Sequence, residues 1–377
     1  MAPDLGADEI SAITDRVAQG WITEGPKSEE FVKGLNELIG VPYGVLAPNG
    51  TLALALGLLA LGVGPGDEVM VPDVTFMGSA TAVILCGAKP VCVDVDGEFF
   101  LFDAKKAEKH LTRRSKAIMP VHLFGVSCNM DLIQAFCQKH GLLMIEDAAQ
   151  GVGVRWKGRH VGSFGDAGCF SFFADKTITT GEGGYISCRD EKTFEKLRLL
   201  RNQGRLDRGS FIHPAVGYNF RMTDMQTAMG CVQLTKLAQI IRKKERLIEK
   251  YQSELAVVPS LRILGAPAGS NQVAFRCVIL APNIRELAAH LESKKIQTRS
   301  VFYPLHRQPA LWEWRLNRSP WLRAVPARFC KIFQDYRGRR FQSSNYLWDH
   351  GLCLPMHMKL TDSDVGMICS EIRAFYS

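Results

Sequence analysis

One loop of the sequence carries a lysine in surroundings that suit covalent chemistry. Lys176 follows Ser171 by five residues in the segment SFFADKTITTGEGG, where a short apolar run gives way to hydroxyl groups and glycines. A lysine held out of water just past a buried strand keeps a neutral amine more readily, and a neutral amine can form a Schiff base with a carbonyl compound. A solvated loop lysine is the commoner case, so this interpretation depends on supporting groups elsewhere in the chain.

Two other segments supply groups that such a lysine would need beside it. Residues 49–51, Asn-Gly-Thr, open a predicted helix over 52–61, and a helix N-terminus with a glycine and a hydroxyl suits a phosphate. Residues 145–150 read as a buried strand that ends in Asp147 and Gln150, and a carboxylate there needs a cationic partner such as a protonated pyridine nitrogen. Ordinary helix capping explains each segment taken alone. The order along the chain of phosphate cradle, carboxylate, serine and lysine favours a single shared site.

An α/β fold would bring these groups together. Between residues 67 and 147, short apolar runs alternate with helix-like segments, a pattern typical of parallel strands joined by crossover helices. One such helix is predicted over 130–140, between a capping Asn129 and a terminating Gly141. The expected strands cover 68–71, 90–95, 117–123, 142–146, 168–173 and 184–188. In such a sheet the carboxyl ends of the parallel strands share one edge, and ligands bind there.

The second half of the chain predicts a smaller domain. Apolar residues at helical spacing predict a long helix over 225–255 that leads into it. The further elements expected are a strand at 273–280, a helix at 283–293 and a strand at 298–303. We therefore predict a large domain over 1–250, with an N-terminal arm over about 1–30, and a small α+β domain over 251–377.

Composition argues against several other classes of protein. The 377 residues are 46% hydrophobic, which is enough for a substantial core, and most of the formal charge of +8 lies in a basic insertion over 307–340, with nine basic residues against Glu313 and Asp335. The eleven cysteines form no CxxC pair and no Cys/His cluster at zinc spacing, so neither a disulfide framework nor a metal site is indicated, and we expect a cytoplasmic protein. We expect no export signal, and no apolar stretch is long enough to predict a membrane span.

The sequence resembles the DegT/DnrJ/EryC1/StrS group of sugar aminotransferases, which depend on pyridoxal 5'-phosphate (PLP), from about Gly20 to the C-terminus. The SFFADKTITTGEGG block carries the resemblance most specifically. The other matching segments are GWITEGP, NGTLALALGLLALGVGPGDEV, PDVTFMGSA, VHLFG, EDAAQ, GYNFRMTDMQTA and TRSVFYPLH. The resemblance implies an α/β fold of the PLP-dependent transferase type I class, similar to aspartate aminotransferase, with a mainly parallel mixed sheet in the large domain.

The resemblance also implies roles for individual residues. Lys176 would hold the cofactor as a Schiff base and move the proton during catalysis, while Asp147 would pair with the pyridine nitrogen. The other cofactor contacts implied are Phe76 against the ring, Gln150 at the 3'-oxygen, and Gly50, Thr51 and Ser171 at the phosphate. Asn219 would reach the phosphate held by a neighbouring subunit, so a homodimer with shared active sites is expected. The expected substrate contacts are Thr23, Glu182, Arg221, Arg299, Tyr303 and His306.

The activity implied is transfer of an amino group from L-glutamate to a keto carbon of a nucleotide-linked deoxysugar. The TITTGEGG form favours GDP-4-keto-6-deoxymannose, which would become GDP-perosamine. Amination at C3, or of a dTDP- or UDP-linked sugar, stays open. The chain departs from the family pattern at Ala174-Asp175, where Gly-Asn is common, and at Leu52, where alanine is common.

Three rival functions are weaker. A sugar 3-dehydratase on the same scaffold would have histidine in place of Lys176, so the lysine opposes it. A nucleic-acid binder would use the basic insertion over 307–340 with its interleaved tryptophans, but we do not expect a nucleic-acid partner. The sequence contains the complete set of expected catalytic residues, which argues against a regulator that binds the cofactor without turnover. The basic insertion follows TRSVFYPLH directly, so we expect it to steer an anionic sugar nucleotide to the site.

Overall fold

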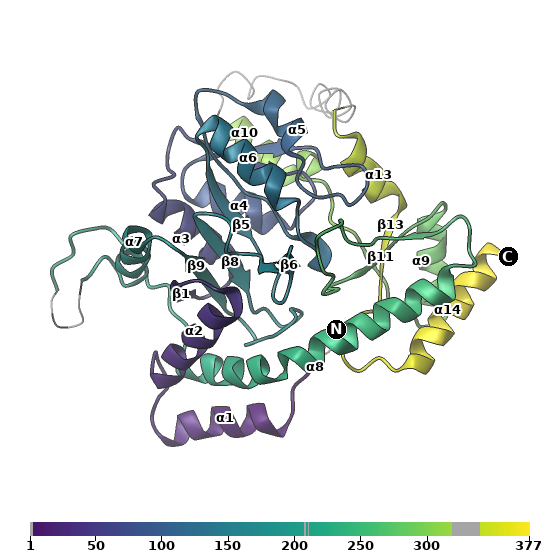
Figure 1. The fold of residues 1–377 in the computed structure, drawn as a ribbon, viewed down its shortest axis with the longest axis horizontal. Helices are drawn as coiled ribbons and strands as arrows, with labels where there is room; N and C mark the ends of the chain where they lie inside the picture. Colours follow the sequence, from purple (N-terminus) through teal and green to yellow (C-terminus); the bar gives the residue numbers. More distant parts are fainter. Residues whose placement is uncertain (1–2, 207–208, 210, 319–339) are drawn as a thin grey trace.

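The computed structural model describes residues 3–206, 209, 211–318 and 340–377, and its centre is a seven-stranded sheet (Figure 1). The strand order is β1-β9-β8-β5-β4-β2-β3. The strands are β1 Tyr43–Ala47, β2 Glu68–Pro72, β3 Lys89–Val93, β4 Ser115–Ile118, β5 Leu143–Asp147, β8 Ala167–Ser171 and β9 Gly184–Cys188. Strand β9 runs opposite to the other six strands, so the expected mainly parallel mixed sheet is confirmed.

Helices cover this sheet, and local signals in the sequence set their ends. They are α3 Gly50–Ala60, α4 Met77–Leu85, α5 Ala104–Ala107, α6 Met130–His140 and α7 Glu191–Arg201. Helix α6 begins and ends as predicted, because the Asn129 side chain accepts a hydrogen bond from the Leu132 N–H and Gly141 adopts a left-handed conformation at φ 63°. Helix α3 is almost entirely buried, which matches its apolar sequence on all faces.

Helix α8, Asp224–Leu255, links this sheet to a second one and begins at a capping box between Thr223 and Gln226. Helices α1, Ala7–Ala18, and α2, Pro26–Ile39, lie against its first half (Figure 1). The α1 helix is attached there through Glu9, whose carboxylate accepts hydrogen bonds from Gln233 and Lys236, each at 2.8 Å. The N-terminal arm is therefore tied to the long helix by buried polar contacts as well as by apolar packing.

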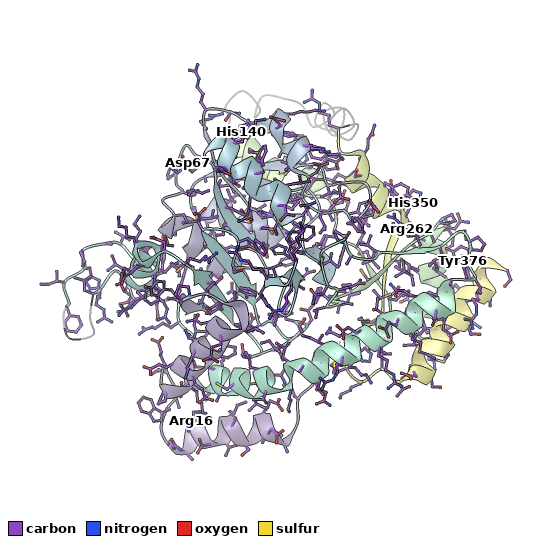
Figure 2. All side chains as sticks on the ribbon, in the orientation of Figure 1. Arg16, Asp67, His140, Arg262, His350 and Tyr376 are labelled. Atoms are coloured by element: carbon purple, nitrogen blue, oxygen red, sulfur yellow. The ribbon has the colours of Figure 1, made fainter. Side chains whose placement is uncertain are left out.

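The second sheet has four antiparallel strands in the order β10-β11-β13-β12. Its strands are β10 Arg262–Ile263, β11 Cys277–Leu280, β12 Arg299–Ser300 and β13 Gly351–Leu354. The accompanying helices are α9 Ile284–Ser293, α10 Pro309–Arg318, α13 Gln342–His350 and α14 Asp362–Tyr376. The labelled Arg262, His350 and Tyr376 mark this side of the molecule (Figure 2). The domain boundary near residue 250 stays a prediction.

Three predicted strands are at least three residues shorter in the structure than the sequence suggests. The predicted 117–123 strand ends at Ile118, because Pro120 has no N–H to donate and the chain then turns through a 3-10 segment, Leu123–Gly125. The predicted 273–280 strand begins only at Cys277, since the Val273 and Phe275 N–H groups donate to Gly125 and Phe124 instead. The predicted 298–303 strand is limited to β12.

Two further observations concern the expected partners. Most of the basic insertion, residues 319–339, lies outside the described residues, so its proposed roles are not tested by the structure. Across the part of the chain that the structure describes, no helix combines the length and the apolar character needed to cross a membrane.

Candidate active site

The N-terminus of α3 forms a tight cradle with the ends of β8 and β9. Asn49 caps the helix by accepting the Leu52 N–H at 3.0 Å. A methyl group added at Gly50 would lie 2.8 Å from the Cβ atom of Ser171, so only glycine lets the helix approach this strand so closely. The Ser171 hydroxyl therefore lies beside the first helical turn, with Thr51 next in the chain. Hydroxyl groups and the unpaired N–H groups of a first turn together suit a phosphate.

Asp147 lies at the end of β5, is 5% exposed and has its carboxylate held from two sides. Oδ2 accepts a hydrogen bond from the Ser79 hydroxyl at 2.6 Å, and Oδ1 accepts the Ala149 N–H at 3.1 Å. Burial raises the pKa of Asp147, while the Ser79 hydrogen bond and the charge of Lys176 act in the opposite direction. A buried carboxylate of this kind gains free energy when a cationic ligand nitrogen is placed against it.

Lys176 lies in the loop between β8 and β9, as predicted, with 15% of its side chain exposed. Burial lowers the pKa of Lys176, and the nearby carboxylates of Asp175 and Asp147 raise it in part. Its Nζ atom lies 3.7 Å from Asp175 Oδ1 and 4.5 Å from the centre of the Phe275 ring. The Lys176 amine is therefore shielded from water and held in place, as a lysine that forms a Schiff base must be.

Aromatic side chains form a wall near the cradle. Phe76 caps α4 and is 63% exposed, and its ring meets Phe302 edge to face at a centroid distance of 6.2 Å. Phe302 in turn stacks on Phe124 at 6.0 Å. The Phe124 N–H donates to Gln150 Oε1 at 2.7 Å, so Gln150 is buried beneath this wall. The exposed Phe76 face is available to a planar ligand, and the backbone bond to Gln150 occupies only its amide oxygen and leaves the amide nitrogen to donate elsewhere.

His306 and Tyr303 come from the second half of the chain, and His306 reaches the loop that precedes Phe76. His306 is buried and pairs with Asp73, with Nδ1 at 2.6 Å from Oδ2 and the backbone N–H at 2.7 Å from Oδ1. Its Nε2 atom finds no hydrogen-bond partner among the described residues. Tyr303 packs edge to face on Trp348 at 4.9 Å and is partly exposed. His306 therefore has a structural partner and one ring nitrogen left over.

Arg299 lies on exposed strand β12 and shares a cavity of about 330 Å³ with Arg276 and Lys295. Several positive side chains around one cavity suit an anionic group such as a carboxylate or a diphosphate. The charge of Arg299 also acts on Arg276, which connects this cavity to the surroundings of Lys176.

The remaining predicted residues lie in a different place, around the start of α8. The Thr23 carbonyl accepts the Asp224 N–H, and the Glu182 carbonyl accepts the Gln226 side chain. Asn219 is exposed and accepts a hydrogen bond from Arg221 at 2.8 Å. Within this chain, these four residues make the contacts given above around the start of α8, and none of these contacts involves Lys176.

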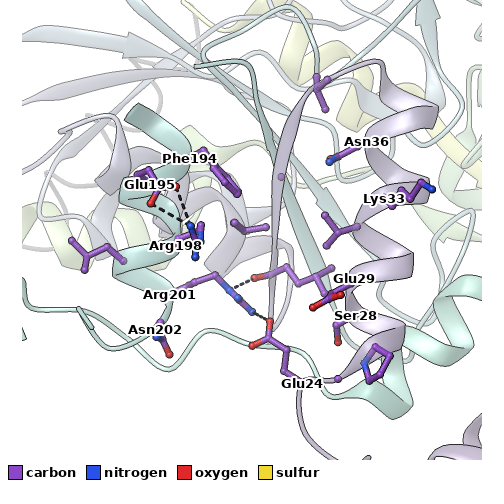
Figure 3. A pocket seen from close by; sticks show the side chains of 18 of the residues that line it. Glu24, Ser28, Glu29, Lys33, Asn36, Phe194, Glu195, Arg198, Arg201 and Asn202 are labelled. Atoms are coloured by element: carbon purple, nitrogen blue, oxygen red, sulfur yellow. Dashed lines mark hydrogen bonds and ion pairs between the residues drawn. The ribbon is translucent and has the colours of Figure 1, made fainter. Parts of the chain in front are cut away.

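A polar groove of about 880 Å³ lies near this second group, between α2 and α7 (Figure 3). Arg201 crosses its end and forms an ion pair with Glu24 at 2.8 Å (Figure 3). The groove is larger than the cavities beside Lys176, yet neither Lys176 nor Asp147 lines it. We therefore assign the chemistry to the Lys176 cluster, where a nucleophile, a carboxylate and an anion cradle converge.

Sequence reasoning missed residues that support the carboxylate. Ser79 belongs to the matching segment PDVTFMGSA, but only the fold reveals that its hydroxyl reaches Asp147. Beside Asp147, the buried Glu146 receives hydrogen bonds from His122 at 2.9 Å and from three backbone N–H groups at 2.7 Å. Burial alone would raise the pKa of Glu146, yet these hydrogen bonds hold it below its usual range. The two adjacent carboxylates therefore differ, because Glu146 receives its hydrogen bonds from within the protein, whereas Asp147 can pair with a cationic ligand.

The residues present fit PLP, the cofactor that the resemblance implies. The cradle at Gly50, Thr51 and Ser171 has the donors that a phosphate needs, and a glycine there leaves the space that a Cβ atom would fill. Asp147 has a buried carboxylate suited to a protonated ring nitrogen, and Lys176 has a desolvated amine.

Comparisons with known proteins agree with this geometry. The model of the DegT/DnrJ/EryC1/StrS aminotransferase family matches residues 3–373. GDP-perosamine synthase of Caulobacter vibrioides is 40% identical over 378 residues, which cover 98% of this chain and 96% of that protein. UDP-N-acetyl-3-dehydro-alpha-D-glucosamine 3-aminotransferase of Acidithiobacillus ferrooxidans is 36% identical over 353 residues, which cover 93% and 88%. The crystal structure of S. venezuelae DesV in complex with a ketimine intermediate is similar with a TM-score of 0.89 at 29% identity, covering 98% and 95% of the two chains. The chain belongs to the DegT/DnrJ/EryC1/StrS family and is a PLP-dependent sugar aminotransferase.

Proposed function

We propose that this enzyme transfers the amino group of L-glutamate to C4 of GDP-4-keto-6-deoxymannose, which yields GDP-perosamine and 2-oxoglutarate. The observation that carries the proposal is the likeness to GDP-perosamine synthases, at 31–40% identity over nearly the whole chain. The UDP-sugar 3-aminotransferase at 36% identity supports the alternative of a different nucleotide and amination at C3.

The residues of the Lys176 site would each have a separate role toward the cofactor. Bound PLP supplies an electrophilic carbonyl and a ring that accepts electrons. Lys176 supplies the amine that holds the cofactor covalently, and its Nζ atom moves the proton between the two carbons of the transfer. Asp147 would keep the ring nitrogen protonated, because its carboxylate is buried and Ser79 orients it. Gly50, Thr51 and Ser171 would hold the phosphate, and Phe76 offers an exposed ring to the cofactor.

The substrate side of the proposal rests on positive and aromatic side chains. Arg299, with Arg276 beside it, lines a cavity whose charge suits the carboxylate of the amino donor or the diphosphate of the sugar nucleotide. His306 contacts the loop that carries Phe76, and Phe302, the neighbour of Tyr303 in the chain, touches Phe76 itself, so we expect Tyr303 and His306 to contact the sugar.

A direct test compares sugar nucleotides with the purified holoenzyme. We expect formation of 2-oxoglutarate and of an amino sugar from GDP-4-keto-6-deoxymannose, with the position of the new nitrogen identified by NMR. Lys176→Ala should abolish turnover, and borohydride reduction of the holoenzyme should leave the cofactor on the peptide that contains Lys176. Turnover with a UDP- or dTDP-linked keto sugar alone would overturn the substrate assignment.

We also propose that the active unit is a homodimer in which Asn219 of one subunit completes the phosphate site of the other. This proposal is supported by the exposure of Asn219, whose only described side-chain hydrogen bond within its own chain comes from the half-buried Arg221 and not from the surroundings of Lys176. Lys176→Ala and Asn219→Ala variants should each be inactive alone. Mixed and refolded together, they should regain about a quarter of the wild-type activity, because one kind of hybrid site is intact; no recovery would contradict the shared site.

A further inference from the structure

Asp175 lies between two cations that come from distant parts of the chain. Its Oδ1 atom is 3.7 Å from Lys176 Nζ, and its Oδ2 atom accepts a hydrogen bond from Arg276 Nη2 at 2.9 Å. The side chains of all three residues are only 12–15% exposed. Both cations also contact the Phe275 ring, whose centre is 4.5 Å from Lys176 Nζ and 4.5 Å from the Arg276 guanidinium carbon. One carboxylate and one aromatic ring therefore hold both positive groups.

The segment that carries Phe275 and Arg276 is itself anchored on three sides. The Phe275 N–H donates to the Phe124 carbonyl at 3.0 Å, in the turn whose N–H group binds Gln150. The carbonyl of Ala274 accepts a hydrogen bond from the buried Lys244 amine of α8 at 3.1 Å. Strand β11 follows directly at Cys277. The position of Lys176 is thus linked through Asp175 to α8, to the four-stranded sheet and to the turn above Gln150.

We propose that Asp175 is a positioning residue, which holds the Lys176 amine over Phe275 through an ion pair that Arg276 anchors from the far side. This inference rests on the proposed role of Lys176 as the cofactor lysine. Asp175 stands where the family commonly has asparagine, so the arrangement is a property of this chain and not of the family pattern. An asparagine in its place keeps the shape but cannot balance two cations.

The charges around Lys176 make the proposal measurable. The groups that face the amine are the carboxylates of Asp175 and Asp147 and the guanidinium of Arg276. Lys244 and His357 line the same small cavity of about 30 Å³. Burial lowers the pKa of Lys176, Asp175 raises it and Arg276 lowers it further. Removal of Asp175 or of Arg276 should therefore shift the titration of the amine in opposite directions.

The experiment measures the reactivity of Lys176 in the cofactor-free protein. Trace labelling with acetic anhydride over a pH series, followed by mass spectrometry of the Lys176 peptide, gives the midpoint of its titration. We expect Asp175→Asn to lower the midpoint by about one pH unit or more, and Arg276→Gln to raise it. The matched control is Asp94→Asn, which removes another buried carboxylate, paired with Lys106 at 2.8 Å, and should leave the midpoint unchanged.

The possible outcomes separate this inference from the proposed function. Midpoints that stay unchanged in both variants, with only a loss of thermal stability, would reduce Asp175 to a structural residue and overturn the inference. A shift of the same sign in both variants would also overturn it. Finding the reduced cofactor on a different lysine would instead refute the assigned role of Lys176, whatever the labelling midpoints are.

Discussion

Lys244 offers a sharp test of the electrostatics beneath the active site. Lys244 is a buried residue of α8, and its amine donates to the Ala274 carbonyl at 3.1 Å. Burial lowers the pKa of Lys244 to about 8, and Arg276 lowers it while Asp175 acts in the opposite direction. The same amine has a pKa of 10.5 when it is unperturbed, as in the unfolded chain. The unfolded state therefore binds the proton more tightly, so stability increases as the pH rises from about 8 to 10.5.

The size of the effect follows from this difference. The fall of the Lys244 pKa from 10.5 to about 8 corresponds to about 3 kcal/mol of destabilisation at pH 7, where both states are protonated. Lys244→Met removes this penalty and loses one hydrogen bond to a carbonyl, which costs about 1 kcal/mol. We expect the variant to be more stable than the wild type by about 2 kcal/mol at pH 7 and to lose most of this advantage by pH 10.

Urea denaturation of the cofactor-free proteins at pH 7 and pH 10 checks this expectation, with the difference in unfolding midpoint between variant and wild type as the measured quantity. Other groups titrate over the same range, but they do so in both proteins and cancel in the difference. Lys243→Met, one residue earlier on the same helix, is the matched control because Lys243 is only partly buried. A midpoint difference that is equal at the two pH values would refute the reasoning.

Three other predictions address burial, the carboxylate and the cradle. Burial lowers the pKa of His160 from 6.5 to about 4, so the unfolded chain takes up a proton first, and the protein should lose about 3 kcal/mol of stability as the pH falls from 6.5 toward 4. In urea titrations at pH 7 and pH 4.5, the His160→Gln variant should lose less stability than the wild type. An equal loss in the two proteins would exclude His160 as the cause. Ser79→Ala removes the hydroxyl that donates to Asp147 and should weaken PLP binding about tenfold in a spectroscopic titration, whereas unchanged affinity would mean that this hydrogen bond does not orient the carboxylate. Gly50→Ala would place a methyl group 2.8 Å from a neighbouring side-chain carbon and should accelerate loss of the cofactor on dialysis, while Gly64→Ala, with no atom within 4 Å of its added methyl group, should retain the cofactor as the wild type does.

Much of the fold could be predicted from local sequence signals. The capping Asn129 and the terminating Gly141 define α6 to the residue, because the hydrogen bond and the left-handed backbone conformation that end a helix depend on those residues alone. The loop with Lys176 lies between two buried strands as expected, since both strands are continuous apolar runs. The clustering of Gly50, Thr51 and Ser171 was predictable for a related reason, because carboxyl ends of parallel strands meet at one edge.

Other predictions were limited because they depend on partners far away in the chain. Residues 273–276 are apolar enough to read as part of a strand, yet their N–H groups bond to the turn at Phe124 and Gly125 and leave the sheet. Nothing local in the sequence distinguishes these two outcomes. The same holds for His306, whose burial against Asp73 follows from the packing of the C-terminal half on the loop before Phe76.

The chemical groups available to this enzyme can be identified from the amino-acid sequence: a lysine, a carboxylate and an anion cradle in an order that a parallel sheet brings to one edge. How these groups are charged and held depends on the folded chain. Ser79 lies 68 residues from Asp147, and Arg276 lies 101 residues from Asp175, so neither contact is visible in any local pattern. The physical reason is that the protonation of a buried group depends on the solvent it loses and the partners it gains, and both are set by segments that meet only when the chain has folded.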